Sequence, residues 1–137
     1  MTIEEHVRTQ TAVLLRRLAF EVNHAAKHCD EQTVHDLRVS IRRLSRCLQV
    51  FSQFYPDRSA KKLRGRLKTL MDPAGAVRDL DIATDLLASA GLDSKANLIY
   101  RMAEMRRLTR RNLEREARAW KGSGFSKRWR SALGLNA

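Results

Sequence analysis

Residues that interrupt helices are scarce in this sequence. Its 137 residues include only two prolines and six glycines, so long stretches are free of helix breakers. Aromatic residues make up 6% of the chain, whereas hydrophobic residues make up 43%. A core with so few aromatic side chains favours a helical bundle packed with leucine, alanine and valine over a β-sandwich. We therefore expect an all-α protein.

Cysteines and long apolar runs are also scarce. No window of 18 residues is apolar, and the N-terminus lacks the basic segment and apolar run of a signal peptide. We therefore expect a soluble, cytoplasmic protein in which Cys29 and Cys47 are reduced and inert. A chain of this length can bury a core without metal or disulfide, so residues 1–137 are predicted to form a single domain.

Acidic residues are the minority among the charged ones. The chain has 15 Asp and Glu against 27 Lys and Arg, which gives a net charge of +12, and 20 of the 27 basic residues are arginine. A planar guanidinium pairs with two phosphate oxygens, whereas an ammonium acts as a point charge. This composition predicts an anionic polymer or a phosphorylated molecule as the partner.

The most informative stretch covers residues 34–51. Apolar residues recur there at spacings of three and four, which predicts a helix with one buried face. A second stripe follows one position later, about a third of a turn away. Like charges on one face repel unless an anion lies along them, although a solvated basic surface is the alternative. The apolar residues are Val34, Leu37, Ile41, Leu44, Leu48 and Phe51, and the second stripe is His35, Arg38, Arg42 and Arg46.

The following segment repeats this pattern. Lys61, Arg64 and Lys68 recur at helical spacing, and leucines take the apolar side with the same offset as before. Two helices that bury their leucines in this way could line one basic trough. The last long helix is also rich in arginine, and we expect some of its arginines to line the same trough.

Three motifs in this order give the sequence a family resemblance. They are VHDLRVSIRRL at 34–44, the helix with spaced Lys and Arg, and AGAVRDLDIATDLL at 74–87. Together they resemble the CHAD family, the conserved-histidine α-helical domains, over about residues 10–120. The resemblance implies a non-catalytic helical domain that binds inorganic polyphosphate and needs no cofactor. Members usually carry two four-helix halves around a basic channel, and this chain has room for one half.

The stripes and the resemblance together predict the site residues. We expect Asp36, Asp79 and Asp81 to orient neighbouring arginines rather than to serve as metal ligands or acids. For His35 the resemblance implies a role at the phosphate, while packing at a helix–helix seam is the alternative. The predicted polyphosphate-binding residues are His35, Arg38, Arg42, Arg43, Arg46, Lys61, Arg64, Lys68, Arg78, Arg107 and Arg111.

Capping signals divide the chain into an antiparallel four-helix bundle with a broken third helix and a short C-terminal helix. Thr2 and Glu5 form a capping box for the first helix, and Asp72-Pro73 is predicted to break the third helix. The last long helix should bury apolar residues that include Leu98 and Met105. The predicted helices are 3–28, 33–54, 57–71 with a continuation to about 90, and about 94–120, and a hinge and tail helix follow in 121–137. The predicted N-caps of the second, third and last long helices are Thr33, Asp57 or Ser59, and Asp93 or Ser94.

Other functions explain the sequence less well. A nucleic-acid-binding protein is the alternative, but the basic stripes carry few aromatics for base stacking and no helix-turn-helix spacing. A phosphate-processing enzyme using His35 is less favoured, because only Asp79 and Asp81 could serve as its carboxylates. His24 and His28 have a zinc-chelating spacing but no third ligand, so we predict no metal site.

The partners expected are polyphosphate or another polyanion, no membrane, and a second copy of the chain. A two-fold homodimer would recreate the two halves that the resemblance implies. Phe125, Trp129 and Leu133 form an apolar stripe on the tail that must be buried on its own bundle or on a partner. Bound polyphosphate would bridge the two copies and offset the repulsion between them.

Overall fold

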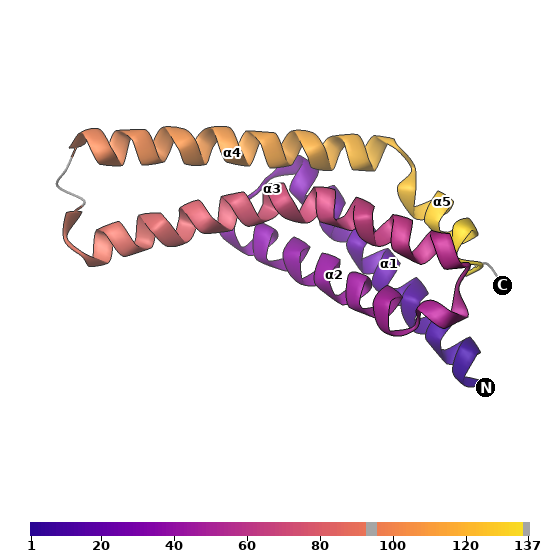
Figure 1. Cartoon of the computed structure of the whole chain (residues 1–137). Coiled ribbons are helices and arrows are strands. Elements are labelled where there is room, and N and C mark those ends of the chain that lie inside the picture. The colour runs from indigo at the N-terminus through magenta and orange to yellow at the C-terminus, as the bar shows by residue number, and fades with distance from the viewer. Residues whose placement is uncertain (93–95, 136–137) are drawn as a thin grey trace.

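Helices make up nearly all of the described chain, and the all-α prediction is confirmed. A computed structural model describes residues 1–92 and 96–135, and no strand occurs in those ranges. The predicted N-cap of the last long helix, Asp93 or Ser94, lies outside the described residues. The elements are α1 (Ile3–Lys27), α2 (Glu31–Val50), the 3-10 turn η1 (Ser52–Phe54), α3 (Asp57–Ser89), α4 (Ala96–Gly122) and α5 (Phe125–Ala132) (Figure 1).

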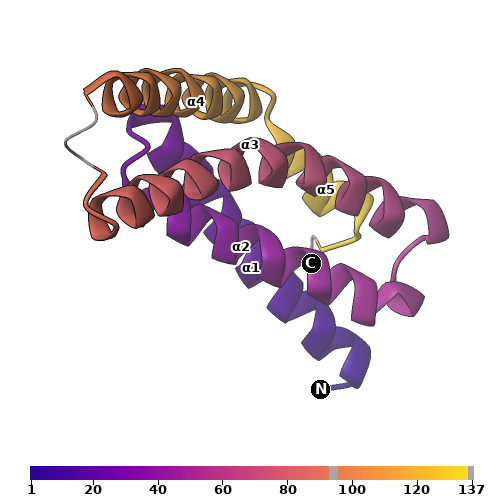
Figure 2. The ribbon, with the colours of Figure 1, turned by 60° about the vertical axis from the view of Figure 1, so that its left-hand side comes forward.

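The four long helices form a closed ring of contacts. α1 packs against α2 and α4, and α3 packs against the same two helices. Consecutive helices run in opposite directions, and α1 and α2 cross α3 and α4 at an angle (Figures 1 and 2). In this arrangement α2 and α4 lie diagonally across the bundle. None of the described helices is long and apolar enough to span a bilayer.

The apolar stripes predicted from the sequence build the core. On α2, all members of the stripe from Val34 to Leu48 are buried, and Phe51 packs half-buried at the edge. On α3, Leu63, Leu67 and Leu70 are buried as well. Each such side chain contributes about 1.5–3 kcal/mol when it is fully removed from water. Burial of these faces leaves the offset basic stripes at the surface.

Two of the predicted helix ends need correction. The capping box is confirmed, with Thr2 and Glu5 exchanging two hydrogen bonds of 3.1 Å. Thr33 is not the N-cap of α2, because the Asp30 carboxylate accepts the Thr33 backbone N–H at 2.7 Å and the helix begins at Glu31. At the other end α2 stops at Val50, and a 3-10 turn rather than α-helix reaches Phe54.

The expected break at Asp72-Pro73 is not present. α3 is one helix of 33 residues with Pro73 in its interior. A proline inside a helix costs about 3 kcal/mol. The buried stripe nevertheless continues through it, from Leu70 to Ala74 and Val77, all at most 1% exposed. The packing of both halves of α3 on one core outweighs the local preference for a break.

The tail closes its own bundle. Phe125, Trp129 and Leu133 are all buried, and both aromatic rings pack edge-on against Trp120 with centroids 5.0 and 5.4 Å apart. Gly124 has a φ of 67°, a conformation that favours glycine, and it turns α5 back onto the bundle. Of the two alternatives that the sequence left open for this stripe, the structure shows burial on its own bundle.

Both cysteines are free thiols, as expected. Cys29 is buried and its Sγ donates a hydrogen bond to the Ala25 carbonyl at 3.1 Å. Burial raises the pKa of Cys29 to about 12. Because the thiolate is the reactive form, the Cys29 thiol is chemically inert.

Candidate functional site

A groove of about 570 Å³ runs between α2 and the first half of α3. Five basic residues line it, and none of the other lining residues is acidic. No ion pair involves any of these five cations within the described residues. The cations are Arg42 and Arg46 on α2 and Lys61, Arg64 and Lys68 on α3, and the remaining lining residues are Ile41, Ser45, Gln49, Gly65, Leu67 and Met71.

Helix geometry explains why the cations of α2 and α3 line the same groove. On α3, Arg64 follows buried Leu63 and Lys68 follows buried Leu67, and on α2, Arg42 follows buried Ile41. Because both helices bury their apolar stripe at one seam, the residues one position later face each other across it. Lys61 and Lys68 are separated by seven residues, or about 10 Å along the helix axis. Members of both predicted stripes therefore line one groove, although His35 and Arg38 of the α2 stripe are not among its lining residues.

The groove is strongly electropositive. The five cations that line the groove repel one another, and no carboxylate of the groove compensates them. Arg42, Arg46, Lys61 and Lys68 are exposed, so an incoming anion can reach them directly. Such a surface is stabilised when an anion lies along it.

Gly65 has no side chain and leaves open space in the groove that it lines. A Cβ placed on Gly65 meets no atom within 4 Å, so the position is open toward the groove that it lines. Ser45 and Gln49 add neutral polar groups on α2. The sequence reading missed these three residues. The two on α2 would have been found by continuing its exposed stripe at spacings of three and four.

Arg43 lies on the flank of α2 that faces α1, and His35 lies between the two flanks and lines a depression on each. They line a depression of about 250 Å³ between α1 and α2, together with Asp36 and Arg17. Arg17, which the sequence reading did not identify, binds buried Glu21 at 3.0 Å. Burial raises the pKa of Glu21, and the positive charge of Arg17 opposes that rise only in part. Among the predicted site residues of α2, Arg43 therefore faces α1, whereas Arg42 and Arg46 face α3.

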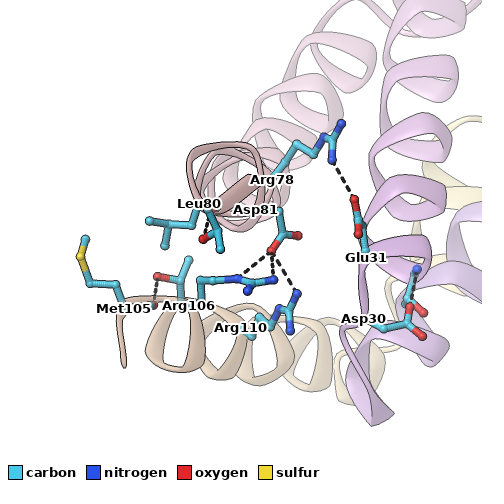
Figure 3. Close-up of polar contacts among 11 residues, drawn as sticks. Asp30, Glu31, Arg78, Leu80, Asp81, Met105, Arg106 and Arg110 are labelled. Carbon is cyan, nitrogen blue, oxygen red and sulfur yellow. Dashed lines mark hydrogen bonds and ion pairs between the residues drawn. The ribbon is translucent and has the colours of Figure 1, made fainter. Parts of the chain in front are cut away.

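Arg78 reaches α2 from α3. Its Nη1 lies 3.2 Å from Oε1 of Glu31 (Figure 3). His35 and Arg78 line the same depression of about 410 Å³ with Glu31 and Gln32. Asp36 accepts a hydrogen bond from Gln32 at 2.8 Å, and no arginine of the described chain pairs with it.

Asp81 holds two arginines of α4. Its Oδ1 accepts hydrogen bonds from Arg106 at 2.8 and 3.1 Å and from Arg110 at 3.0 Å (Figure 3). The Asp81 side chain is only 3% exposed, whereas both arginines are 31% exposed. Asp81 therefore orients arginines, as the sequence indicated, but the sequence did not identify Arg106 and Arg110 as its partners. Asp79 is exposed and pairs with no described residue.

The α4 arginines do not join the groove. Arg107 and Arg111 line a separate depression of about 340 Å³ on α4 with Arg106 and Arg110, and Arg107 is paired with Glu104. The expectation that α4 lines the same trough is wrong, because α4 lies diagonally opposite α2 in the bundle. Arg38 is half-buried, and its Nε has no hydrogen-bond partner among the described residues.

Comparison with known families identifies the domain. A family model described as the CHAD domain matches residues 10–134. The chain belongs to the CHAD domain family. The CHAD match includes the groove between α2 and α3, the Asp81 cluster and the tail helix α5. No curated protein and no solved structure matches the chain.

The CHAD groove offers charge rather than reactive groups. It contains no carboxylate, histidine or cysteine. Elsewhere in the described residues, no three His, Cys, Asp or Glu side chains gather as metal ligands would. What this arrangement can do chemically is bind phosphate oxygens through guanidinium and ammonium groups.

Proposed function

We propose that this CHAD domain binds inorganic polyphosphate in the groove between α2 and α3, without catalysing a reaction on it. The observation that carries the proposal is the set of five unpaired cations in a groove with no carboxylate. A linear polyanion can follow the groove and meet the cations of both helices along about 10 Å of its length. The arginines can each pair with two phosphate oxygens.

The groove favours a bare phosphate chain over a nucleic acid. None of its lining residues is aromatic, so it provides no platform for stacking bases. A nucleic acid would bind only through its backbone, as a less flexible competitor for the same cations. Membership of the CHAD family, whose domains are generally binding modules, supports the non-catalytic part of the proposal.

The test compares polyanions at one salt concentration. We expect long-chain polyphosphate to bind more tightly than duplex or single-stranded DNA of equal total charge near physiological salt. A separate salt titration of polyphosphate binding should give a slope of log K against log salt of about −3.5, from five contacts with about 0.7 counterions released per contact. Duplex DNA that binds as tightly as polyphosphate would favour the nucleic-acid function instead.

Variants test whether polyphosphate binds in the groove. Arg42→Ala and Lys61→Ala should each weaken polyphosphate binding, with little change in melting temperature. Each should also reduce the slope of log K against log salt by about 0.7, the value expected for one lost contact. The matched control is Arg128→Ala, which removes an exposed arginine from α5 and should leave affinity nearly unchanged. Equal losses in all three variants would mean that net charge, rather than the groove, attracts the ligand.

A further inference from the structure

The seam between α2 and α3 continues beyond the five-cation groove, toward the N-terminal end of α2. The depression of about 410 Å³ lies there, lined by Glu31, Gln32 and His35 of α2 and by Arg78 of α3. Arg78 follows Lys68, a lining residue of the groove, by ten residues or about 15 Å along the helix axis. The groove and this depression are therefore neighbouring parts of one seam.

Glu31 lies on the side of α2 that faces the groove. It precedes Arg42 by eleven residues, which is about three full turns or 16 Å, so the two side chains point the same way. Arg38 lies between them on that side, and its Nε has no hydrogen-bond partner among the described residues. A polyanion that continues from the groove along α2 therefore passes Arg38 and then meets Glu31.

Glu31 already binds the cation at this end of the seam. Nη1 of Arg78 donates a hydrogen bond to Oε1 of Glu31 at 3.2 Å (Figure 3). The Glu31 side chain is 63% exposed and that of Arg78 is 36% exposed. An ion pair with this exposure contributes little to stability, so a polyanion can displace the carboxylate. Arg78 differs in this pairing from the five groove cations, which form no ion pair within the described residues.

We propose that Glu31 competes with polyphosphate for Arg78 and thereby limits the affinity of the domain for long chains. A short chain fills the five-cation groove and leaves the pair between Glu31 and Arg78 intact. A longer chain continues past Arg38, displaces the carboxylate into solvent and gains Arg78 as a sixth cation. The inference rests on the proposed function, because it concerns the same ligand on the same seam.

Calorimetry with long-chain polyphosphate and with tripolyphosphate tests the competition. Glu31→Gln keeps the side-chain shape and removes the charge, so it should strengthen long-chain binding about threefold, within the range for one exposed ion pair. The slope of log K against log salt should become steeper by about 0.7, the value for one added contact. Tripolyphosphate is too short to occupy both depressions. Its affinity should be unchanged, because position 31 lies about 16 Å from Arg42, beyond the screening length of about 8 Å.

Two further variants separate the release of Arg78 from a change in net charge. Arg78→Ala combined with Glu31→Gln should abolish the gain, because the released cation is then missing. The matched control is Glu4→Gln, which removes an exposed carboxylate paired with Arg8 at 2.8 Å on α1. It changes the net charge equally and also releases an arginine, but away from the seam, so long-chain affinity should stay nearly the same.

The outcomes distinguish this inference from the proposed function. Equal gains for Glu31→Gln and Glu4→Gln, or a gain that persists without Arg78, would overturn the competition. An equal gain for tripolyphosphate and long chains would overturn it as well. Long-chain binding that is weakened by Arg42→Ala but unaffected by Glu31→Gln would refute only this inference, whereas a wild-type protein that binds no polyphosphate would refute the proposed function itself.

Discussion

Gly65 allows folding and binding to be perturbed separately at one position. It lies inside α3 and has no special backbone conformation, and a Cβ added to it meets nothing within 4 Å. Alanine is favoured over glycine in a helix interior by about 0.8–1.0 kcal/mol. Gly65→Ala should therefore stabilise the protein by about 1 kcal/mol and raise its melting temperature by about 3–5 °C. Polyphosphate affinity should be unchanged, because a methyl group leaves the groove open.

Larger residues at position 65 should act on binding instead. Gly65→Gln and Gly65→Glu have nearly the same shape and differ in charge, so their comparison separates crowding from electrostatics. The glutamate would lie in a groove lined by Lys61, Arg64 and Lys68. At an effective dielectric constant of about 20, one unit charge about 8 Å away changes the binding energy by about 2 kcal/mol. Screening by salt and water reduces this to about 1 kcal/mol, or a factor of about five in affinity.

Titration calorimetry and thermal melts on the three variants measure both effects. The reasoning predicts that alanine raises stability alone, glutamine lowers affinity moderately, and glutamate lowers it further. Equal affinities for the glutamine and glutamate variants would show that the polyanion does not pass Gly65. A lower melting temperature for Gly65→Ala would show that the open space around this position has been misjudged.

Three further predictions concern stability. Leu44→Ala removes a fully buried side chain and should cost about 2–5 kcal/mol in urea unfolding without lowering the affinity of the folded protein; a loss below 1 kcal/mol would contradict its place in the core. Asp81→Asn should cost about 1–3 kcal/mol, because Arg106 and Arg110 lose charge-assisted hydrogen bonds, and their 31% exposure favours the lower end; an unchanged unfolding midpoint would refute this role. Glu21 has a raised pKa because it is buried, so the folded state binds its proton more readily than the unfolded state. Stability therefore falls as pH rises from the carboxyl pKa of the unfolded chain to the higher pKa of the folded state. Glu21→Gln should therefore gain stability over the wild type at pH 7 compared with pH 4, and a difference that is the same at both pH values would contradict the shift.

Periodicity within single helices could be read from the sequence. The stripe from Val34 to Leu48 and the basic stripe one position behind it depend only on 3.6 residues per turn. The same holds for the α3 cations, and the two stripes line one groove because both helices bury their leucines at a shared seam. The capping box at Thr2 was equally accessible, since its partners are three residues apart.

Contacts between distant segments were decided by the tertiary structure. The sequence does not state how far each helix is rotated about its axis, so it did not separate Arg43 on the α1 side of α2 from Arg42 on the α3 side. Asp81 meets Arg106 only because α3 and α4 pack as a hairpin. Local rules predicted a break at Pro73, and packing on both sides of it kept α3 whole.

The hairpin of α3 and α4 also shows that the sequence alone does not decide which helix faces are covered. The spacing of Leu98 and Met105 is that of a buried stripe, but in the structure the two residues are 37% and 51% exposed. Only the lengths and positions of α1 and α2 determine that the tip of the hairpin extends past the other long helices (Figure 1). The sequence by itself therefore determined which residues of each helix are apolar and which are cationic. The tertiary structure decided which of these faces meet, because that depends on where the other helices end.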